Sequence, residues 1–318
     1  PAAAVGGVWE CPDLFELPVD GDPDDSRWVL IVSLNPGGIA GGSGTQYFIG
    51  DFDGTHFTSE APRVGTAPVP EDSALWADYG ADYSAAVSYS DVPAEDGRRI
   101  WLGWMNNWMY ANDIPTSPWR SAQSLPRVLS LTRTPEGLRL VQEPVAELRS
   151  LRGERRALGS RPIPAGTTSL AAEGISGTAL EIVAELEVGS ASDVGLKVRT
   201  GENEETVIGV DPRAGTLFVD RTRSGEASFH DRFASRQTAP LRVADGRVRL
   251  HVFVDWSSVE VFAADGRRVI TDQIYPAPES DGVALYATGG SARLVSLEAW
   301  PLKSSWTGAA AETRTGSR

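Results

Sequence analysis

The sequence predicts an all-β protein with two domains, and three observations support this prediction. Short segments rich in β-branched and aromatic residues recur along the chain, turn residues separate them, and no amphipathic helix of useful length interrupts the pattern. With 318 residues the chain is long enough for two domains with an ample core. Residues 1–142 are typical of short antiparallel strands in a sandwich or a propeller blade, and residues 161–302 alternate as in a β-sandwich.

The predicted strands of the first region follow one another with turns between them. A glycine-rich loop, 35–44, follows the first long apolar strand. No Lys-Ser/Thr pair follows the loop and no helical period begins there, so we interpret it as a flexible loop near a pocket or a plain hairpin connection rather than a phosphate site. Beyond a strand-like segment near the N-terminus, the predicted strands are 28–34, a pair within 47–58 around an Asp-Gly turn, 85–89, 99–105, 127–132 and 138–141.

A change of composition marks the predicted domain boundary. Residues 143–160 are charged and leucine-spaced, so we expect a linker that holds a helical turn. The tail, 303–318, is small and polar without periodicity, which predicts a flexible segment. Between linker and tail the predicted strands are 180–188, 194–199, 205–210, 216–220, 248–255, 259–262 and 294–300.

The charge balance and the counts of metal-binding residues argue against several classes of protein. With 29 Lys and Arg against 43 Asp and Glu, the formal charge of −14 repels phosphate backbones and anionic membrane surfaces, so we expect neither nucleic acid nor membrane as a partner. One cysteine excludes an internal disulfide, and three scattered histidines make a metal site improbable, so neither a metal nor another cofactor is expected. Ten tryptophans supply faces that fill cores and suit stacking on sugar rings.

One stretch near the N-terminus, Gly6–Phe15, combines groups that suggest chemistry. Glu10 lies between Trp9 and Cys11, the only thiol, and a proline follows them. Burial against Trp9 would keep Glu10 protonated near neutrality, and a carboxylic acid in that state can serve as a general acid. The alternative is that Trp9 is a core residue of a strand and Glu10 its solvated neighbour. The residues of this stretch alone leave both interpretations open.

A series of motifs in one order resembles glycoside hydrolase family 32, the levanases, inulinases and invertases. The resemblance runs from Gly6 to about Trp300. Its motifs are Trp9–Phe15, Tyr47–Gly54, Asp78–Asp82, Gly103–Trp108, Pro118–Arg120 and Leu125–Arg127 in the first region, and Asp220–Gly225 and Phe253–Phe262 in the second. The resemblance implies a five-bladed β-propeller followed by a C-terminal β-sandwich.

The resemblance also implies a reaction. Retaining enzymes of this kind hydrolyse β-fructofuranosyl linkages with two carboxyl groups roughly 5–5.5 Å apart, one as nucleophile and the other as acid and then base. Glu10 matches the family's acid/base, and Trp9 and Cys11 beside it are expected to contact substrate. Cys11 is expected to tune and pack rather than to attack, because no histidine or basic neighbour is there to make a thiolate.

The sequence departs from the family pattern in one large respect. The family's nucleophile lies in a Trp-Met-Asn-Asp-Pro-Asn-Gly motif and its transition-state-stabilising aspartate in Arg-Asp-Pro, and neither motif occurs in these 318 residues. We therefore expect 1–142 to be an incomplete propeller, about two of five blades, with the nucleophile outside this chain. Because an open propeller exposes strand edges and apolar faces, a missing N-terminal half or a partner chain is expected to complete it, and the chain alone is expected to be inactive.

The remaining site candidates each have a plainer alternative. Trp104 matches a family tryptophan that lines the fructosyl subsite, and the alternative is core packing. Asp82 is expected to bond a fructosyl hydroxyl or to position Glu10, and the alternative is a turn cap. Further subsite contacts are expected from Asn107, Trp108 and Trp119.

Three functional hypotheses follow from the resemblance. The first is a secreted, exo-acting fructosidase of levanase or inulinase type, with fructan or sucrose as substrate. The second is a non-catalytic module whose sandwich binds fructan or buttresses the propeller, which the absent nucleophile favours for the isolated chain. The third is a fructosyltransferase of the same family, in which a sugar hydroxyl replaces water as acceptor.

Overall fold

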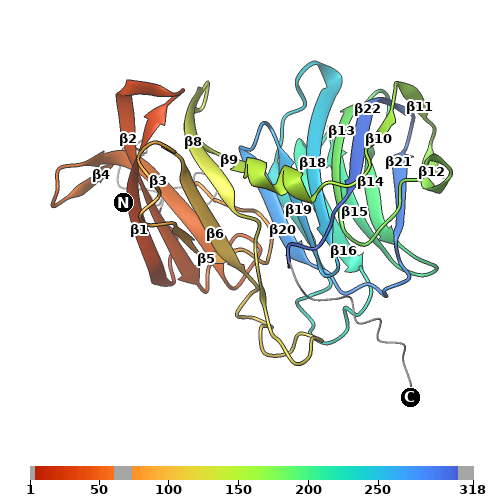
Figure 1. The fold of residues 1–318 in the computed structure, drawn as a ribbon, viewed down its shortest axis with the longest axis horizontal. Helices are drawn as coiled ribbons and strands as arrows, with labels where there is room; N and C mark the ends of the chain where they lie inside the picture. The colour runs from red at the N-terminus through yellow and green to blue at the C-terminus, as the bar shows by residue number, and fades with distance from the viewer. Residues whose placement is uncertain (1–3, 61–73, 307–318) are drawn as a thin grey trace.

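The computed structural model describes residues 4–60 and 74–306 and shows a protein built almost entirely of β-strands. Figure 1 shows two lobes side by side, with the N-terminal strands in red to yellow at the left and the C-terminal strands in green to blue at the right. The all-β prediction is confirmed, as a partial propeller followed by a sandwich. In the described ranges no helix has the length and the apolar character needed to cross a membrane.

The first blade is a meander of four antiparallel strands. A tight turn joins the first two strands, because Asp20 and Gly21 both have positive φ angles (52° and 78°), the conformation that matches the twist of a hairpin. Along the second strand, within the apolar run predicted at 28–34, Val29 and Ile31 are fully buried on either side of the less buried Leu30, and residues 31–34 are buried throughout. The strands are β1 (Val8–Val19), β2 (Asp22–Asn35), β3 (Gly44–Phe52) and β4 (Phe57–Ser59).

The second blade continues the same sheet, which remains open. Its strands are β5 (Ser84–Ser88), β6 (Arg99–Met105), β8 (Arg127–Thr134) and β9 (Gly137–Pro144), and the short β7 (Ala122–Gln123) pairs with β6. The blades meet where Val19 pairs with Leu131 in a parallel bridge. Both blades contribute to one apolar core that includes Phe15, Ile31 and Trp101.

The beginnings of β1 and β5 lie at the same end of the blades. β5 is antiparallel to β6, β6 is antiparallel to β8, and β8 is parallel to β1, so β1 and β5 run in the same direction. Asp13 of β1 ties them together, because its Oδ2 accepts hydrogen bonds from the backbone N (2.9 Å) and Oγ (2.6 Å) of Ser88. The ends of β2 and β6, and the loops that follow them, therefore gather at this end, which we call the open end.

The C-terminal lobe is a sandwich of two antiparallel sheets that enclose one large apolar core. The period of two predicted for this region is confirmed, because buried and less buried residues alternate along its strands. One sheet contains β10 (Arg156–Leu158), β11 (Arg161–Ile163), β13 (Leu180–Glu187), β18 (Arg247–Asp255), β19 (Ser258–Ala263), β20 (Arg268–Gln273) and β22 (Ala292–Pro301). The other contains β12 (Gly166–Ser169), β14 (Asp193–Thr200), β15 (Glu205–Asp211), β16 (Thr216–Arg223), β17 (Arg236–Pro240) and β21 (Gly282–Thr288).

The segment 143–160, predicted as a linker, is docked on the sandwich. It contains the expected helical turn as the 3-10 helix η2 (Ala146–Leu151), but residues 156–158 form β10, which pairs with β22. β10 was not predicted, because three residues are too few to show an alternation of apolar and polar residues in the sequence. Of the tail predicted at 303–318, residues 303–306 have no regular structure, and the rest lies outside the described residues.

The blades contact the sandwich through two buried arginines. Arg127 of β8 is fully buried and donates to Asp78 Oδ2 (3.0 Å), Glu260 Oε2 (2.7 Å) and Thr271 Oγ1 (2.7 Å), so it joins both lobes. Burial raises the pKa of Glu260, and Arg127 opposes that shift. Arg221 of β16, also fully buried, lies at a second cluster in the same interface. Buried charges of this kind need matched partners, so the interface fixes how the lobes meet.

Candidate active site

Glu10 lies at the open end, on a bulge of β1. Glu10 pairs with Ser33, whereas the next pair joins Asp13 to Ile31, so β1 carries one extra residue there. Cys11, inside the bulge, has a positive φ of 46°. Bulges re-aim side chains and are common beside active sites. The carboxyl group of Glu10 is exposed, and no hydrogen bond or ion pair joins it to another residue in the ranges 4–60 and 74–306.

Of the two interpretations of this stretch, the one that buries Glu10 against Trp9 is wrong, because Glu10 is exposed. Successive side chains of a strand point to opposite faces, so Trp9 cannot cover the residue that follows it. Trp9 packs instead on Phe48, with ring centroids 5.8 Å apart, and its indole N–H donates to the carbonyl oxygen of Val5 (3.3 Å). Cys11 is a free and exposed thiol, so within the described residues its side chain is not buried as a packing role would require.

Asp13, the next carboxylate along β1, is fully occupied. Its Oδ1 accepts the backbone N–H of Leu14 (2.9 Å), and its Oδ2 holds Ser88. Glu10 and Asp13 lie on the same strand, but the carboxylate oxygens of Asp13 are bonded to the protein and those of Glu10 are exposed to solvent. Glu10 is the carboxylate that can give a proton to a bound molecule or take one from it.

Asn107 assembles the loops at the open end. Its side-chain Nδ2 donates to the carbonyl oxygens of Gly41 (3.0 Å) and Ala81 (2.8 Å), and its Oδ1 accepts the backbone N–H of Ser43 (3.2 Å). A Cβ on Gly42 would lie 2.1 Å from Asn107 Oδ1, so the close approach requires glycine. Asn107 is fully buried, and its side-chain amide is bonded to the loops that surround it.

Two tryptophans, Trp104 near the end of β6 and Trp108 in the loop after it, form an aromatic surface at the open end. The rings of Trp104 and Trp108 lie 4.9 Å apart, and Trp108 is 53% exposed. The backbone N of Trp108 donates to Ser43 Oγ (3.0 Å), which fixes its position relative to the loop after β2. Trp119 is 50% exposed in the same 106–121 segment, and within the described part of the chain its ring contacts no other aromatic ring. Exposed indole faces can stack on apolar faces of a ligand.

Asp82 lies in the interface and not at the surface of the open end. It is fully buried, its Oδ1 accepts the hydroxyl of Tyr110 (2.7 Å), and its Oδ2 accepts Nη1 of Arg221 (2.5 Å) and the backbone N of Gln273 (2.8 Å). These bonds leave Asp82 no side-chain oxygen without a protein partner. The sequence interpretation missed Arg221 and Tyr110, although Arg221 belongs to a quoted motif, because pairing across two domains leaves no local pattern.

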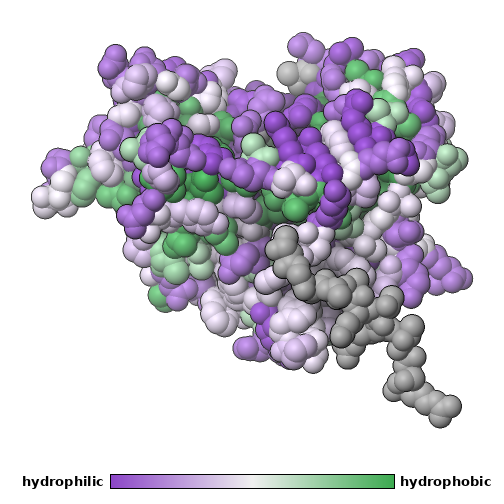
Figure 2. Space-filling model, viewed as in Figure 1, coloured by the Kyte–Doolittle hydropathy of each residue, from purple (hydrophilic) through white to green (hydrophobic). Residues whose placement is uncertain are grey.

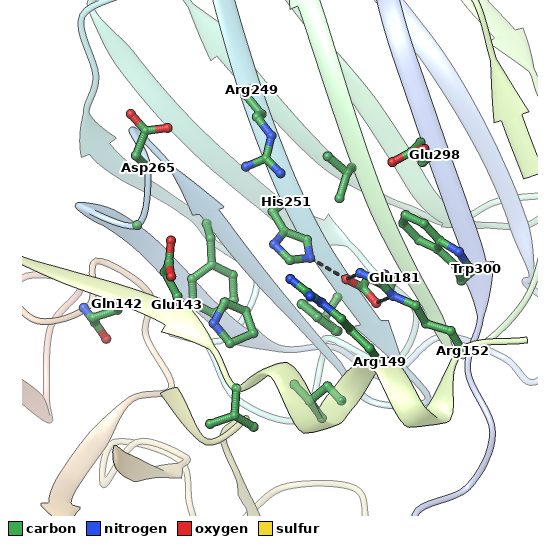
Figure 3. Close-up of a pocket in the computed structure, with 17 residues that line it drawn as sticks. Gln142, Glu143, Arg149, Arg152, Glu181, Arg249, His251, Asp265, Glu298 and Trp300 are labelled. Carbon is green, nitrogen blue, oxygen red and sulfur yellow. Dashed lines mark hydrogen bonds and ion pairs between the residues drawn. The ribbon is translucent and has the colours of Figure 1, made fainter. Parts of the chain in front are cut away.

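A separate pocket of about 370 Å³ lies between η2, β9 and the sandwich (Figure 3). Glu181 is buried at its wall and accepts Nη2 of Arg152 (2.5 Å) and Nε2 of His251 (2.7 Å). Burial would raise the pKa of Glu181, but these partners lower it to about 2. Arg152 also lies 3.9 Å above the ring of Trp300. The pocket contains none of the site residues predicted from the sequence, and its cluster docks η2 on the sandwich.

Comparison with known proteins finds a sequence model of the same family for each of the two lobes. The sequence model described as the glycosyl hydrolases family 32 N-terminal domain matches residues 2–144, and the one described as the family 32 C terminal matches residues 147–301. The levanase of Bacillus subtilis (strain 168) is 54% identical over 305 residues, which are 95% of this chain and 44% of that protein. The extracellular exo-inulinase inuE of Aspergillus niger is 40% identical over 313 residues, 96% of this chain and 57% of that protein.

The fold is similar to a solved structure of the same kind. The crystal structure of exo-inulinase from Aspergillus awamori superimposes with a TM-score of 0.83 at 36% identity, covering 95% of this chain and 58% of that chain. The chain thus spans about half the length of these relatives. Two models of one family cover almost the whole chain, in the order in which the two lobes occur. The chain therefore belongs to glycoside hydrolase family 32.

Proposed function

We propose that this protein hydrolyses β-fructofuranosyl linkages in levan, inulin or sucrose, with levan as the first candidate. The observation that carries the proposal is Glu10, an exposed carboxylate that has no partner among the described residues, on a bulge at the same end of the blades as the aromatic pair Trp104 and Trp108. Family membership supports the reaction class, and the 54% identity to a levanase supports levan. The name of an extracellular exo-inulinase among the relatives supports secretion.

In the proposed mechanism Glu10 acts twice. It first protonates the leaving oxygen while a carboxylate nucleophile attacks the anomeric carbon of the fructosyl unit and the glycosidic bond breaks. It then takes a proton from water as the water oxygen attacks the same carbon and releases the nucleophile, so configuration is retained. The ring pair of Trp104 and Trp108 is suited to hold the fructosyl unit or the next sugar by stacking.

The nucleophile is proposed to come from polypeptide outside these 318 residues, because the family motif that carries it is absent. Apolar side chains exposed at the start of β1 and around β5 support contact with further blades: Val8 (64%), Val87 (47%), Tyr89 (43%) and Trp9 (40%). Figure 2 shows apolar residues, in green, at the surface of the blade lobe at the left. We therefore propose that the chain alone is inactive.

Complementation tests the proposal. Fructose release from levan, inulin and sucrose is measured with this chain alone and after mixing with a separately produced polypeptide that carries the missing family motifs. We expect release only from the mixture, fastest with levan. A folded, stable assembly that releases no fructose from any of the three substrates would contradict the proposal.

A second candidate is a non-catalytic fructan-binding module, and the absence of the nucleophile motif favours it for the isolated chain. Calorimetric titration of this chain with levan oligosaccharides separates the two, because binding without turnover by any assembly supports the module. A fructosyltransferase gives longer fructans at high sucrose concentration in the same complementation assay, whereas a hydrolase gives free fructose.

A further inference from the structure

The segment that carries Trp108 is supported from behind by the sandwich. Tyr110 and Ile114 of this segment are buried in a small apolar cluster with Phe233 of the sandwich. The rings of Tyr110 and Phe233 lie 5.4 Å apart, edge to face. Phe229 joins the cluster with its ring 6.2 Å from that of Tyr110. The shape of the blade segment is therefore set in part by residues of the other domain.

Arg221 is the polar centre of this support. It is fully buried on β16 and donates to Asp82 Oδ2 (2.5 Å), the hydroxyl of Tyr110 (2.9 Å) and the carbonyl oxygens of Phe233 (2.8 Å) and Gln273 (3.1 Å). Burial raises the pKa of Tyr110 well above its usual range, so the hydroxyl keeps its proton and donates it to Asp82 Oδ1 (2.7 Å). Arg221, Asp82 and Tyr110 thus form a closed triangle of hydrogen bonds.

A short series of bonds connects this triangle to the open end. The backbone N of Tyr110 donates to the carbonyl oxygen of Asn107 (3.0 Å). Asn107 in turn holds Gly41 and Ser43 of the facing loop, and Ser43 Oγ accepts the backbone N of Trp108 (3.0 Å). The buried guanidinium of Arg221 is therefore linked to the exposed indole of Trp108 through a continuous series of hydrogen bonds.

We propose that Arg221 is a positioning residue for the aromatic surface of Trp104 and Trp108, and so for the sugar ring that stacks there; this last step rests on the proposed function. The guanidinium presents donors in a planar fork and remains charged, so it holds Asp82 and Tyr110 in one arrangement. A buried ion pair adds little net stability compared with well-packed apolar groups, so the role proposed for the pair of Arg221 and Asp82 is to fix geometry. The sandwich thereby takes part in shaping the candidate active site.

Arg127 supplies a matched control. It is as buried as Arg221, lies in the same interface and bonds two carboxylates, but its partners are Asp78, Glu260, Thr271 and Gln142. None of these partners belongs to the segment 106–121. Substitution of either arginine is therefore expected to weaken the interface. Of the two, only Arg221 is bonded to the segment that carries Trp108, through Tyr110.

The first test measures the position of Trp108 without any activity. The full chain is labelled with 5-fluorotryptophan, and the 19F resonance of Trp108 is assigned among the ten tryptophans with Trp108→Phe. We expect this resonance to shift and broaden in Arg221→Lys and in Tyr110→Phe, and to stay unchanged in Arg127→Lys. Tyr110→Phe removes only the hydroxyl, so it decides the question if Arg221→Lys does not fold. An unchanged resonance in Tyr110→Phe, or an equal change in Arg127→Lys, would overturn the proposal.

The second test uses the complemented assembly that releases fructose. Arg221→Lys and Tyr110→Phe should raise KM for levan about tenfold with a smaller change in kcat, because a displaced stacking surface weakens substrate positioning. Arg127→Lys should leave KM within about twofold. If no assembly releases fructose, the proposed function fails and the fluorine measurement still decides the role of Arg221. If fructose is released and KM is the same in all variants, the positioning of substrate by Arg221 is refuted.

Discussion

Two acids from the motifs of the first region, Glu10 and Asp82, show how differently the open end and the interface between the lobes are built. At the interface Asp82 is fully buried and has three side-chain hydrogen bonds, whereas Glu10 at the open end is exposed and has none in the described part of the chain. The interface satisfies its charges within the protein and thereby fixes geometry. At the open end a carboxylate and the faces of two indole rings remain exposed. Groups that bind a substrate must be accessible in this way.

The largest change in unfolding free energy is expected from a variant that disrupts the interface between the lobes. Arg127→Met leaves the carboxylates of Asp78 and Glu260 buried without their cation, so we expect a loss of about 3–5 kcal/mol in the free energy of unfolding. Glu10→Gln should change that free energy by less than about 0.5 kcal/mol, because its side chain is exposed. Urea unfolding of the two variants measures the contrast. Equal losses would mean that the open end contributes to stability as the interface does.

A second test concerns pH and the cluster of Glu181, Arg152 and His251. The pKa of Glu181 in the folded protein is lowered from 4.5 to about 2, so its contribution is present above about pH 4.5 and is lost as pH falls toward 2. We expect the wild type to lose up to about 3 kcal/mol of unfolding free energy across this window because of Glu181. Glu181→Gln should remove that part of the slope. Parallel pH profiles of unfolding free energy for the two proteins would contradict the assignment.

A third test compares two glycines with positive φ. Gly42→Ala should cost about 1–3 kcal/mol, because its Cβ meets Asn107 Oδ1 at 2.1 Å in addition to the backbone strain at φ 59°. Gly21→Ala carries the strain of φ 78° but meets nothing within 4 Å, so we expect about 1 kcal/mol. Thermal unfolding of both variants is the measurement. A larger loss for Gly21→Ala would mean that Asn107 does not hold the loop as described.

The smallest expected effect lies inside the interface. Burial raises the pKa of Asp272 to about 7 against the opposing charge of Arg221, so its contribution is complete below about pH 3.8 and is lost as pH rises through 7. Asp272→Asn keeps an oxygen for the backbone N of Ala81 and removes this loss, so at pH 8 we expect no net cost in unfolding free energy relative to the wild type, which loses stability between about pH 4 and pH 7. Asp82→Asn, which disturbs three bonds, should cost more at the same pH in a parallel urea titration. The reverse order would contradict the roles given to the two aspartates.

Strands with clear alternation could be predicted from the sequence, and strands held by tertiary bonds could not. The strands at 99–105 and 180–187 were expected within one residue of their observed bounds. β20 was missed because buried Asp272 and Gln273 interrupt its apolar pattern, and their partners lie far away in the chain. β12 was missed because all of its residues are exposed and polar, so no apolar face marked it.

The candidate site shows the same limit. Motif resemblance selected Glu10, Asp82, Asn107 and Trp108 alike, because each lies in a quoted stretch. It could not tell which of them face solvent, since that depends on the bulge at Cys11 and on Arg221 reaching across the interface. Local sequence therefore selected the candidate residues, and the packing of the two lobes decides which of them are exposed, as Glu10 and Trp108 are, and which are buried, as Asp82 and Asn107 are.

The most direct test of the central claim is the rate of fructose release from levan by the complemented assembly with Glu10→Gln. Glu16→Gln is the matched control, because Glu16 is an exposed glutamate on the same strand. We predict that Glu10→Gln lowers kcat about 10²–10⁴-fold with unchanged unfolding free energy, as expected for loss of a general acid and base. Glu16→Gln should keep the wild-type rate. An assembly carrying Glu10→Gln that releases fructose at the wild-type rate would contradict the account.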